Sequence, residues 1–180
     1  MVELKNELER RDQQQRGQNL TYQSLGRFDQ QVTTKPHRDG GPDQSILMLG
    51  YEPTTVQCRI SIADYAKCAF DMELTPAEFL EQYNPMFPDG FNRLSDYSVE
   101  LTDFDHTAFQ ILIINNSITP IGDDRLVGVL HTATIVNPDP DQSRVVNSTM
   151  IACNAESPLG TDDEQHFIDT QIIRREKYEL

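Results

Sequence analysis

Apolar and polar residues follow strand-like patterns along most of this chain. Between residues 55 and 62, apolar side chains occupy every second position, which predicts a strand with one buried and one solvent-facing side. Unbroken apolar runs bounded by turn residues predict buried strands at 45–51 and 109–114. Further strands are expected at 28–35, 127–136 and 144–153. With little helix between the last three, these segments favour an all-β sandwich or barrel with peripheral helices.

Helical periodicity is confined to shorter parts of the chain. Residues 2–15 are mostly charged but carry two leucines four positions apart, which predicts a thinly amphipathic helix. The segments 64–70 and 75–83 are also helical in pattern. Thr75 is a natural N-cap, and Glu78 completes a capping box three positions later. Two short helices are therefore expected between the third and fourth strands.

The remaining segments divide the chain into a core and two extensions. Residues 84–108 are rich in turn-forming residues and predict an irregular excursion, a common form for lids and binding loops. Residues 167–178 are expected to pack as a final strand or helix. We therefore expect a single domain over 1–180, with a helical and polar N-terminal extension (1–27), a core (28–153) and a C-terminal extension (154–180).

The charge balance restricts the partners of the protein. Lysine and arginine number 15 against 29 acidic residues, so the formal net charge is −14. Such a surface repels phosphate backbones and anionic lipids, and we expect neither nucleic acid nor membrane as a partner. Three cysteines without tight spacing argue against a disulfide framework or a cysteine-rich zinc site. The chain shows neither a signal peptide nor a run near the roughly 20 apolar residues of a membrane helix, so a cytoplasmic location is expected.

The run around His37 and Asp39 is the first candidate for chemistry. On an extended backbone these side chains project to the same side, where an imidazole nitrogen and a carboxylate oxygen can bind one metal ion. A second histidine would complete the two-histidine, one-carboxylate set that suits non-haem Fe(II). Of four histidines, only His131 lies within a strongly predicted strand. The plainer alternatives are a hydrogen-bonded core histidine at 131 and a solvated turn at 37–39.

Arg144 is the second candidate, because it follows His131 across a predicted turn at 137–141. A hairpin there would bring Arg144 beside the strand of His131. An arginine on an apolar strand needs an anionic partner, and its planar fork suits a carboxylate. Arg59, on the polar side of the 55–62 strand, is an alternative anion anchor, although a surface role is commoner for such a residue.

Taken in order, His37-x-Asp39, His131 and Arg144 resemble the motif of the Fe(II)- and 2-oxoglutarate-dependent oxygenases. The resemblance covers residues 28–153 and implies a double-stranded β-helix, the jelly-roll or cupin-like fold. It implies that His37, Asp39 and His131 hold Fe(II) at the catalytic centre and that Arg144 binds the distal carboxylate of 2-oxoglutarate. The implied dioxygenase reaction uses O2 to convert this cosubstrate to succinate and carbon dioxide, and usually hydroxylates a C–H bond of a small-molecule or protein substrate.

The chain departs from this family in the position of one helper residue. Some members carry a serine two positions after the arginine, where this chain has Val146. Ser148 lies one strand repeat further, so either Thr132, Thr134 or Tyr51 is the expected helper or Arg144 holds the carboxylate alone. Because Asp39 supplies a carboxylate ligand, no position is left for a halide and halogenation is disfavoured. Hydroxylation, desaturation and demethylation stay open.

Two other classes of protein remain alternatives. One is a metal-binding cupin enzyme that does not use 2-oxoglutarate, for which Arg144 has no cosubstrate to bind. The other is a non-catalytic β-sandwich interaction protein, in which His37 and His131 are expected to lie far apart. Asn115 and Asn116 close the 109–114 strand and either bind substrate or cap the strand end. The substrate itself has no readable signature in the sequence.

Overall fold

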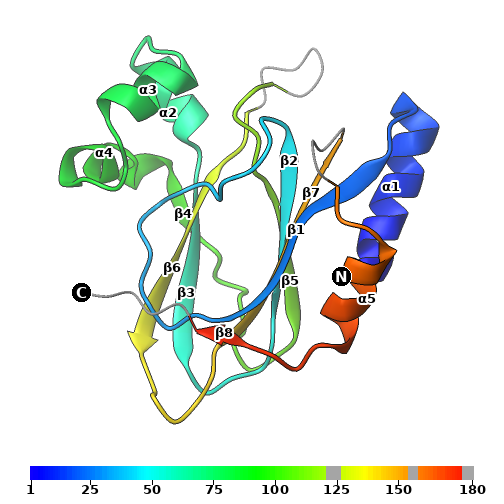
Figure 1. Cartoon of the computed structure of the whole chain (residues 1–180). Coiled ribbons are helices and arrows are strands. Elements are labelled where there is room, and N and C mark those ends of the chain that lie inside the picture. Colours follow the sequence, from blue (N-terminus) through cyan, green and yellow to red (C-terminus); the bar gives the residue numbers. More distant parts are fainter. Residues whose placement is uncertain (121–126, 154–157, 176–180) are drawn as a thin grey trace.

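The computed structural model describes residues 1–120, 127–153 and 158–175, which form two largely antiparallel sheets with helices at the periphery (Figure 1). Within these residues the large sheet has the strand order β5-β2-β7-β1-β8. Its strands are β1 (Leu20–Asp29), β2 (Ser45–Tyr51), β5 (Gln110–Asn115), β7 (Val145–Cys153) and β8 (Arg174–Arg175). The small sheet has the order β4-β3-β6, from β3 (Gln57–Ala63), β4 (Ser98–Glu100) and β6 (Leu130–Asn137). The mainly β class predicted from the sequence is confirmed.

The main core lies between the two sheets. Strand β2 sends Leu47, Leu49 and Tyr51 inward, where they meet Ile60 of β3 and Val146 of β7. Alternate residues of the same strand point to the opposite side. There Met48 packs with Leu20 and Tyr22 beneath α1 (Val2–Arg16). The large sheet is therefore covered on one side by the small sheet and on the other by a helix.

A second group of helices follows β3 and covers one end of the small sheet. It comprises α2 (Tyr65–Asp71), α3 (Pro76–Gln82), α4 (Pro88–Arg93) and the 3-10 turn η1 (Ser95–Tyr97). The capping box predicted at the start of α3 is confirmed, because Thr75 accepts from the Glu78 N–H while the Glu78 carboxylate accepts from the Thr75 N–H. The last helix is α5 (Thr161–Asp169). Within the described residues, no helix has both the length and the apolar character needed to cross a membrane.

Most predicted strands are found within a few residues of their expected positions, but the first one is not. The strand expected at 28–35 lies earlier, as β1, and so takes in part of the supposed polar extension. A bulge between Tyr22 and Ser24 breaks the alternation that would have revealed it. The excursion expected at 84–108 contains α4, η1 and β4. The final element expected at 167–178 is the end of α5 followed by β8, and residues 176–180 lie outside the described part.

The hairpin expected between the strands of His131 and Arg144 is absent from the described structure. Strand β6 pairs with β3 in the small sheet, whereas β7 pairs with β1 and β2 in the large one. Both edges of β7 are therefore occupied, and the connection at 138–144 crosses from one sheet to the other. The main chain of Arg144 consequently leads into a strand of the large sheet and does not lie beside β6 in one sheet.

Candidate metal centre

The segment that carries His37 runs alongside β6 without being a regular strand. His37 and His131 exchange both main-chain hydrogen bonds, with N···O distances of 3.0 and 2.9 Å, so they form an antiparallel pair. Nearby, the hydroxyl oxygens of Thr33 and Thr34 accept the N–H groups of Ile135 and Ala133. Side-chain acceptors here replace part of the main-chain ladder, which is why the segment is irregular.

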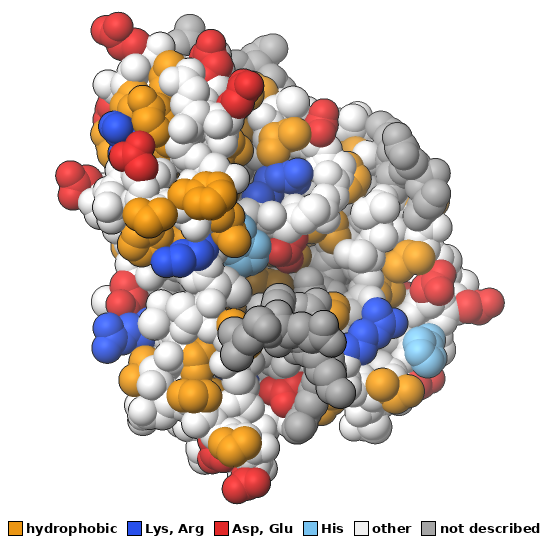
Figure 2. Space-filling model, turned by 60° about the vertical axis from the view of Figure 1, so that its left-hand side comes forward, with side chains coloured by type: hydrophobic (Ala, Val, Ile, Leu, Met, Phe, Trp, Pro, Cys, Tyr) orange, Lys and Arg blue, Asp and Glu red, His pale blue; other side chains and the backbone are white. Residues whose placement is uncertain are grey.

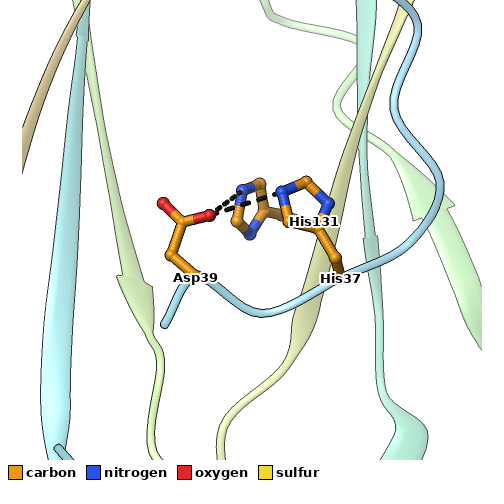
Figure 3. A group of neighbouring side chains, drawn as sticks. All are labelled: His37, Asp39 and His131. Atoms are coloured by element: carbon orange, nitrogen blue, oxygen red, sulfur yellow. Dashed lines mark ion pairs between the residues drawn. The ribbon is translucent and has the colours of Figure 1, made fainter. Parts of the chain in front are cut away.

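Three potential ligands converge at this pair. Nε2 of His37 lies 3.3 Å from Oδ1 of Asp39, and Nε2 of His131 lies 3.8 Å from the same oxygen. Figure 3 shows the three side chains meeting from two separate segments. One ligand atom from each lies within 4.8 Å of the others, a grouping that can hold a metal ion. The structure thus brings together all three residues predicted as ligands.

Neighbouring groups orient two of these ligands. Nδ1 of His37 lies 2.7 Å from the carbonyl oxygen of Lys35, which leaves Nε2 free to face Asp39. A histidine that ligates a metal commonly donates its other ring N–H in this way. The main-chain carbonyl of Asp39 accepts from Nδ2 of Asn116 (3.0 Å), and Arg38 donates to the carbonyl of Asn116 (3.1 Å). Asn116 is fully buried just after β5. It therefore fixes the ligand segment, residues 33–39 with His37 and Asp39, to the large sheet.

The three side chains differ in their tendency to ionise. Burial lowers the pKa of His131 to about 4, helped by the nearby His37 and opposed by Asp39. Asp39 raises the pKa of His37 above its usual value, against the effect of burial. Burial also acts to raise the pKa of Asp39, but the two histidines and Arg38 together bring it below its usual range. Near neutral pH the site therefore offers a carboxylate and a neutral His131, both competent to bind a cation.

The group borders a cavity of about 580 Å³ between the two sheets. Figure 2 shows the surface hollowed where a histidine and an acidic side chain are visible, with apolar side chains gathered at one side. Its wall includes Tyr51 and Ser148 together with apolar residues of β1, β2 and β7. Binding sites for small molecules are usually cavities of this size with mostly apolar walls.

Arg144 is buried beside this cavity but does not itself line it. Its side chain is 2 % exposed, and it donates to Sγ of Cys58 (3.2 Å) and to the carbonyl of Gln30 (3.0 Å). Its guanidinium carbon stands 5.2 Å from the ring centre of Tyr51. Among the described residues, Nη2 has no hydrogen-bond acceptor. A buried guanidinium with a free donor is suited to an anionic ligand.

The other residues considered from the sequence fall into distinct places. Arg59 is exposed on β3 and is not part of the cavity wall, so it does not replace Arg144. Of the expected helpers, Tyr51 lies against Arg144, whereas Thr132 donates to the carbonyl of Thr34 and Thr134 is exposed. Asn116 was expected either to bind substrate or to cap the strand end. Its side-chain amide donates to the main-chain carbonyl of Asp39 and so holds the ligand segment.

Two contributions were missed by reasoning from the sequence. Cys58 lies on the face of β3 that packs against the core, and its sulfur also accepts from Arg144. Arg174 lines the cavity although it lies far along the chain in the C-terminal extension. Its position depends on a long-range strand pairing, for which the local pattern carries no signal.

Comparison with protein families, with curated proteins and with solved structures finds no match for this chain. The chemistry of the site must therefore be argued from its own geometry.

Proposed function

We propose that this protein is a non-haem Fe(II)- and 2-oxoglutarate-dependent oxygenase. The main observation in support is that His37, Asp39 and His131 converge at one cavity, with ligand atoms within 4.8 Å of one another. Two histidines and one carboxylate on one side of a metal ion leave positions open for cosubstrate and oxygen. The closeness of the two histidines also supports a metal site over the alternative of a non-catalytic interaction protein.

The order of strands supports a jelly-roll as the finer description of the fold. Residues 34–37 hydrogen-bond to the edge of β6 that does not pair with β3. They therefore add a fourth, irregular strand to the small sheet. Successive strands then alternate between large and small sheets, except at the steps from β3 to β4 and from β7 to β8. Such alternation between two facing sheets is expected of a double-sheet jelly-roll. The proposed metal site lies at one mouth of that structure, where the ligand segment crosses between the sheets.

The residues have separate roles in this proposal. His37, Asp39 and His131 hold the iron, and Lys35 and Asn116 orient them through main-chain and side-chain hydrogen bonds. Bound iron with 2-oxoglutarate and O2 supplies the oxidising chemistry that converts R–H to R–OH, with succinate and carbon dioxide as coproducts. Arg144 binds the distal carboxylate of the cosubstrate through Nη2, and Tyr51 shapes the cavity wall in front of it.

A second candidate is a metal-dependent enzyme of the same fold that does not use 2-oxoglutarate. One observation favours it: Arg144 does not line the cavity and already has two acceptors, Cys58 and Gln30. The two candidates differ in whether Arg144 contributes to binding of 2-oxoglutarate. For either, the net charge of −14 disfavours nucleic acid and anionic membranes as partners.

The test combines metal affinity with succinate formation. Protein loaded with Fe(II) under anaerobic conditions is supplied with 2-oxoglutarate, ascorbate and O2, and succinate is quantified by chromatography. Metal affinity is measured separately with Co(II) or Mn(II). Asp39→Ala should weaken metal binding by more than about 100-fold, because even outer-shell partners of a metal site contribute 10- to 100-fold. Succinate formation should fall with it.

Matched variants separate the candidates. Asp96→Ala removes an exposed carboxylate remote from the cavity and should leave both measurements unchanged. Arg144→Gln should keep metal affinity but lose 2-oxoglutarate binding; if 2-oxoglutarate binds neither the wild-type protein nor this variant, the enzyme without 2-oxoglutarate is favoured. An Asp39→Ala protein with full metal affinity and full turnover would refute the proposed function.

A further inference from the structure

The described part of the C-terminal segment, residues 158–175, is held along β1 by main-chain hydrogen bonds near both of its ends. Near its start, the N–H of Leu159 donates to the carbonyl of Tyr22 (2.9 Å). At its end, β8 pairs in parallel with β1, with Arg174 opposite Phe28 (Figure 1). Because the pairing partner is a core strand, the backbone of Arg174 has a defined position and not that of a loose tail.

This pairing brings Arg174 to the wall of the cavity that contains the metal group. The part of the wall formed by β1, β2 and β7 is largely apolar. It includes Leu25, Phe28, Leu49, Val146 and Met150. A ligand in this cavity can therefore contact the guanidinium of Arg174, the apolar side chains and the metal group, which is the set of candidate ligands His37, Asp39 and His131.

No acidic residue in the described part of the chain forms an ion pair with Arg174. Among the described residues, no carboxylate lies within 4.0 Å of Arg174 or of Arg38, the other arginine on the cavity wall. The chain has nearly twice as many acidic as basic residues, so arginines at a cavity without a described carboxylate partner are informative. Of the acidic side chains on the wall, Asp39 belongs to the metal group and Asp29 accepts the main-chain N–H of Arg144.

We propose that Arg174 binds the carboxylate of the substrate and that the substrate class is a monocarboxylic acid with an apolar body. The guanidinium supplies two parallel donors to the carboxylate. The apolar body lies along the cavity wall, so that carbon atoms away from the carboxylate approach the metal group. The identity of this ligand as a substrate rests on the proposed oxygenase function, whereas the carboxylate site itself does not.

In this proposal the carboxylate of the substrate and the distal carboxylate of 2-oxoglutarate bind to different arginines. Arg144 is buried behind Tyr51, whereas Arg174 is exposed on the cavity wall beside Phe28. The buried anchor suits a cosubstrate used in every turnover. The exposed anchor is open to a ligand that enters from solvent.

The test uses hexanoate as the probe and hexanamide as its uncharged counterpart. Dissociation constants are measured by ligand-observed NMR, first on metal-free protein and then on protein loaded with Mn(II) and 2-oxoglutarate. Hexanoate should bind more tightly than hexanamide. Arg174→Gln should weaken hexanoate binding by about 10-fold or more, the usual scale for a hydrogen-bonded charge pair, and leave hexanamide unchanged. Arg174→Lys should restore part of the difference, and Arg59→Gln, an equal loss of charge at an exposed site off the cavity, should have no effect.

The Mn(II) arm also reports orientation, because the paramagnetic ion broadens nearby protons most. The methyl end of hexanoate should broaden more than the protons next to the carboxylate. Equal affinity of hexanoate for wild-type and Arg174→Gln protein overturns the proposal, as does loss of 2-oxoglutarate binding in that variant. If Mn(II) fails to bind but hexanoate binding still depends on Arg174, the oxygenase function fails and the carboxylate site stands.

Discussion

Arg144 keeps a charged guanidinium at 2 % exposure, with one nitrogen that has no acceptor among the described residues. Removing such a group from water costs several kcal/mol, and incomplete hydrogen bonding leaves part of that cost uncompensated. Its contacts with Cys58, Gln30 and Tyr51 fix its orientation without supplying an opposite charge. A residue maintained at such a cost is more readily explained by a ligand than by stability.

Replacing Arg144 by methionine should separate these two explanations. An apolar residue of similar length removes a buried charge, a change that is often neutral or stabilising. We expect the free energy of unfolding of the ligand-free protein to change by about 1 kcal/mol or less in urea denaturation. Stabilisation by 2-oxoglutarate should disappear. A loss of more than about 3 kcal/mol without ligand would instead assign Arg144 a structural role.

Tyr51 gives a prediction about pH. Burial raises its pKa to about 12, against the opposing charge of Arg144, whereas a tyrosine in the unfolded chain titrates near 10. Between pH 10 and 12 the unfolded state therefore loses its proton first, and stability falls as pH rises. From pH 9 to pH 11, Tyr51→Phe should lose about 1.4 kcal/mol less stability than wild type in urea denaturation. Phe109→Leu, an exposed aromatic site without a titratable group, is the control and should lose as much as wild type.

At the scale of elements, the proposed metal site depends on how the ligand segment is held between the two sheets. One side of the segment pairs with β6 through His37 and His131. The other side is tied to the end of β5 through Asn116, which bonds the carbonyl of Asp39 and the hydroxyl of Ser45. The carboxylate is thus positioned by a residue that never touches the metal.

Asn116→Ala should therefore weaken metal binding while all three ligands remain. The loss expected for an outer-shell partner is about 10- to 100-fold in the dissociation constant for Mn(II). Urea denaturation without metal shows how much of the effect is general destabilisation, since Asn116 is buried. Asn92→Ala, at an exposed position in α4, should leave metal affinity unchanged. Full affinity in Asn116→Ala would mean that the pairing with β6 suffices.

The capping box of α3 gives a prediction independent of function. Thr75→Ala removes the acceptor for the Glu78 N–H and should lower the free energy of unfolding by about 1 kcal/mol. Thr75→Ser keeps the hydroxyl and should restore most of that loss. Metal affinity should be the same in both variants, because α3 does not line the cavity. Chemical denaturation and a Mn(II) titration check the two statements.

At the scale of the whole molecule, a metal ion would join residues that are about a hundred positions apart in the chain. A cation that binds only the folded state stabilises it by mass action. Mn(II) at 100 times its dissociation constant should raise the free energy of unfolding by about 2.7 kcal/mol. His131→Ala should abolish this gain, whereas His166→Ala, at an exposed position in α5, should retain it. An equal gain in both variants would place the binding site elsewhere.

The sequence predicted single strands better than their neighbours in space. Short apolar runs bounded by turn residues located β2 and β5, and strict alternation located β3, because burial of one face imposes those patterns. The partners of β7 were not predictable in this way. Pairing depends on which distant strands reach its two edges, and β1 and β2 occupy both.

The same distinction applies to the candidate site. His37, Asp39 and His131 were identifiable because residue type and a local spacing suggested metal ligands, and the structure brings them together. Arg174 was not identifiable, since its place at the cavity follows from a pairing with Phe28 far earlier in the chain. Short sequence motifs can identify residues with a given chemistry, whereas the residues that line a cavity depend on the whole fold.

The paired main chains of His37 and His131 have a consequence for how this protein tolerates insertions and deletions. Adding or removing one residue between Thr34 and His37 would shift the register against β6 and turn the imidazole of His37 to the opposite face. The two sheets do not depend on that register and would still form. A single-residue change between Thr34 and His37 should therefore yield a folded protein without the proposed metal site.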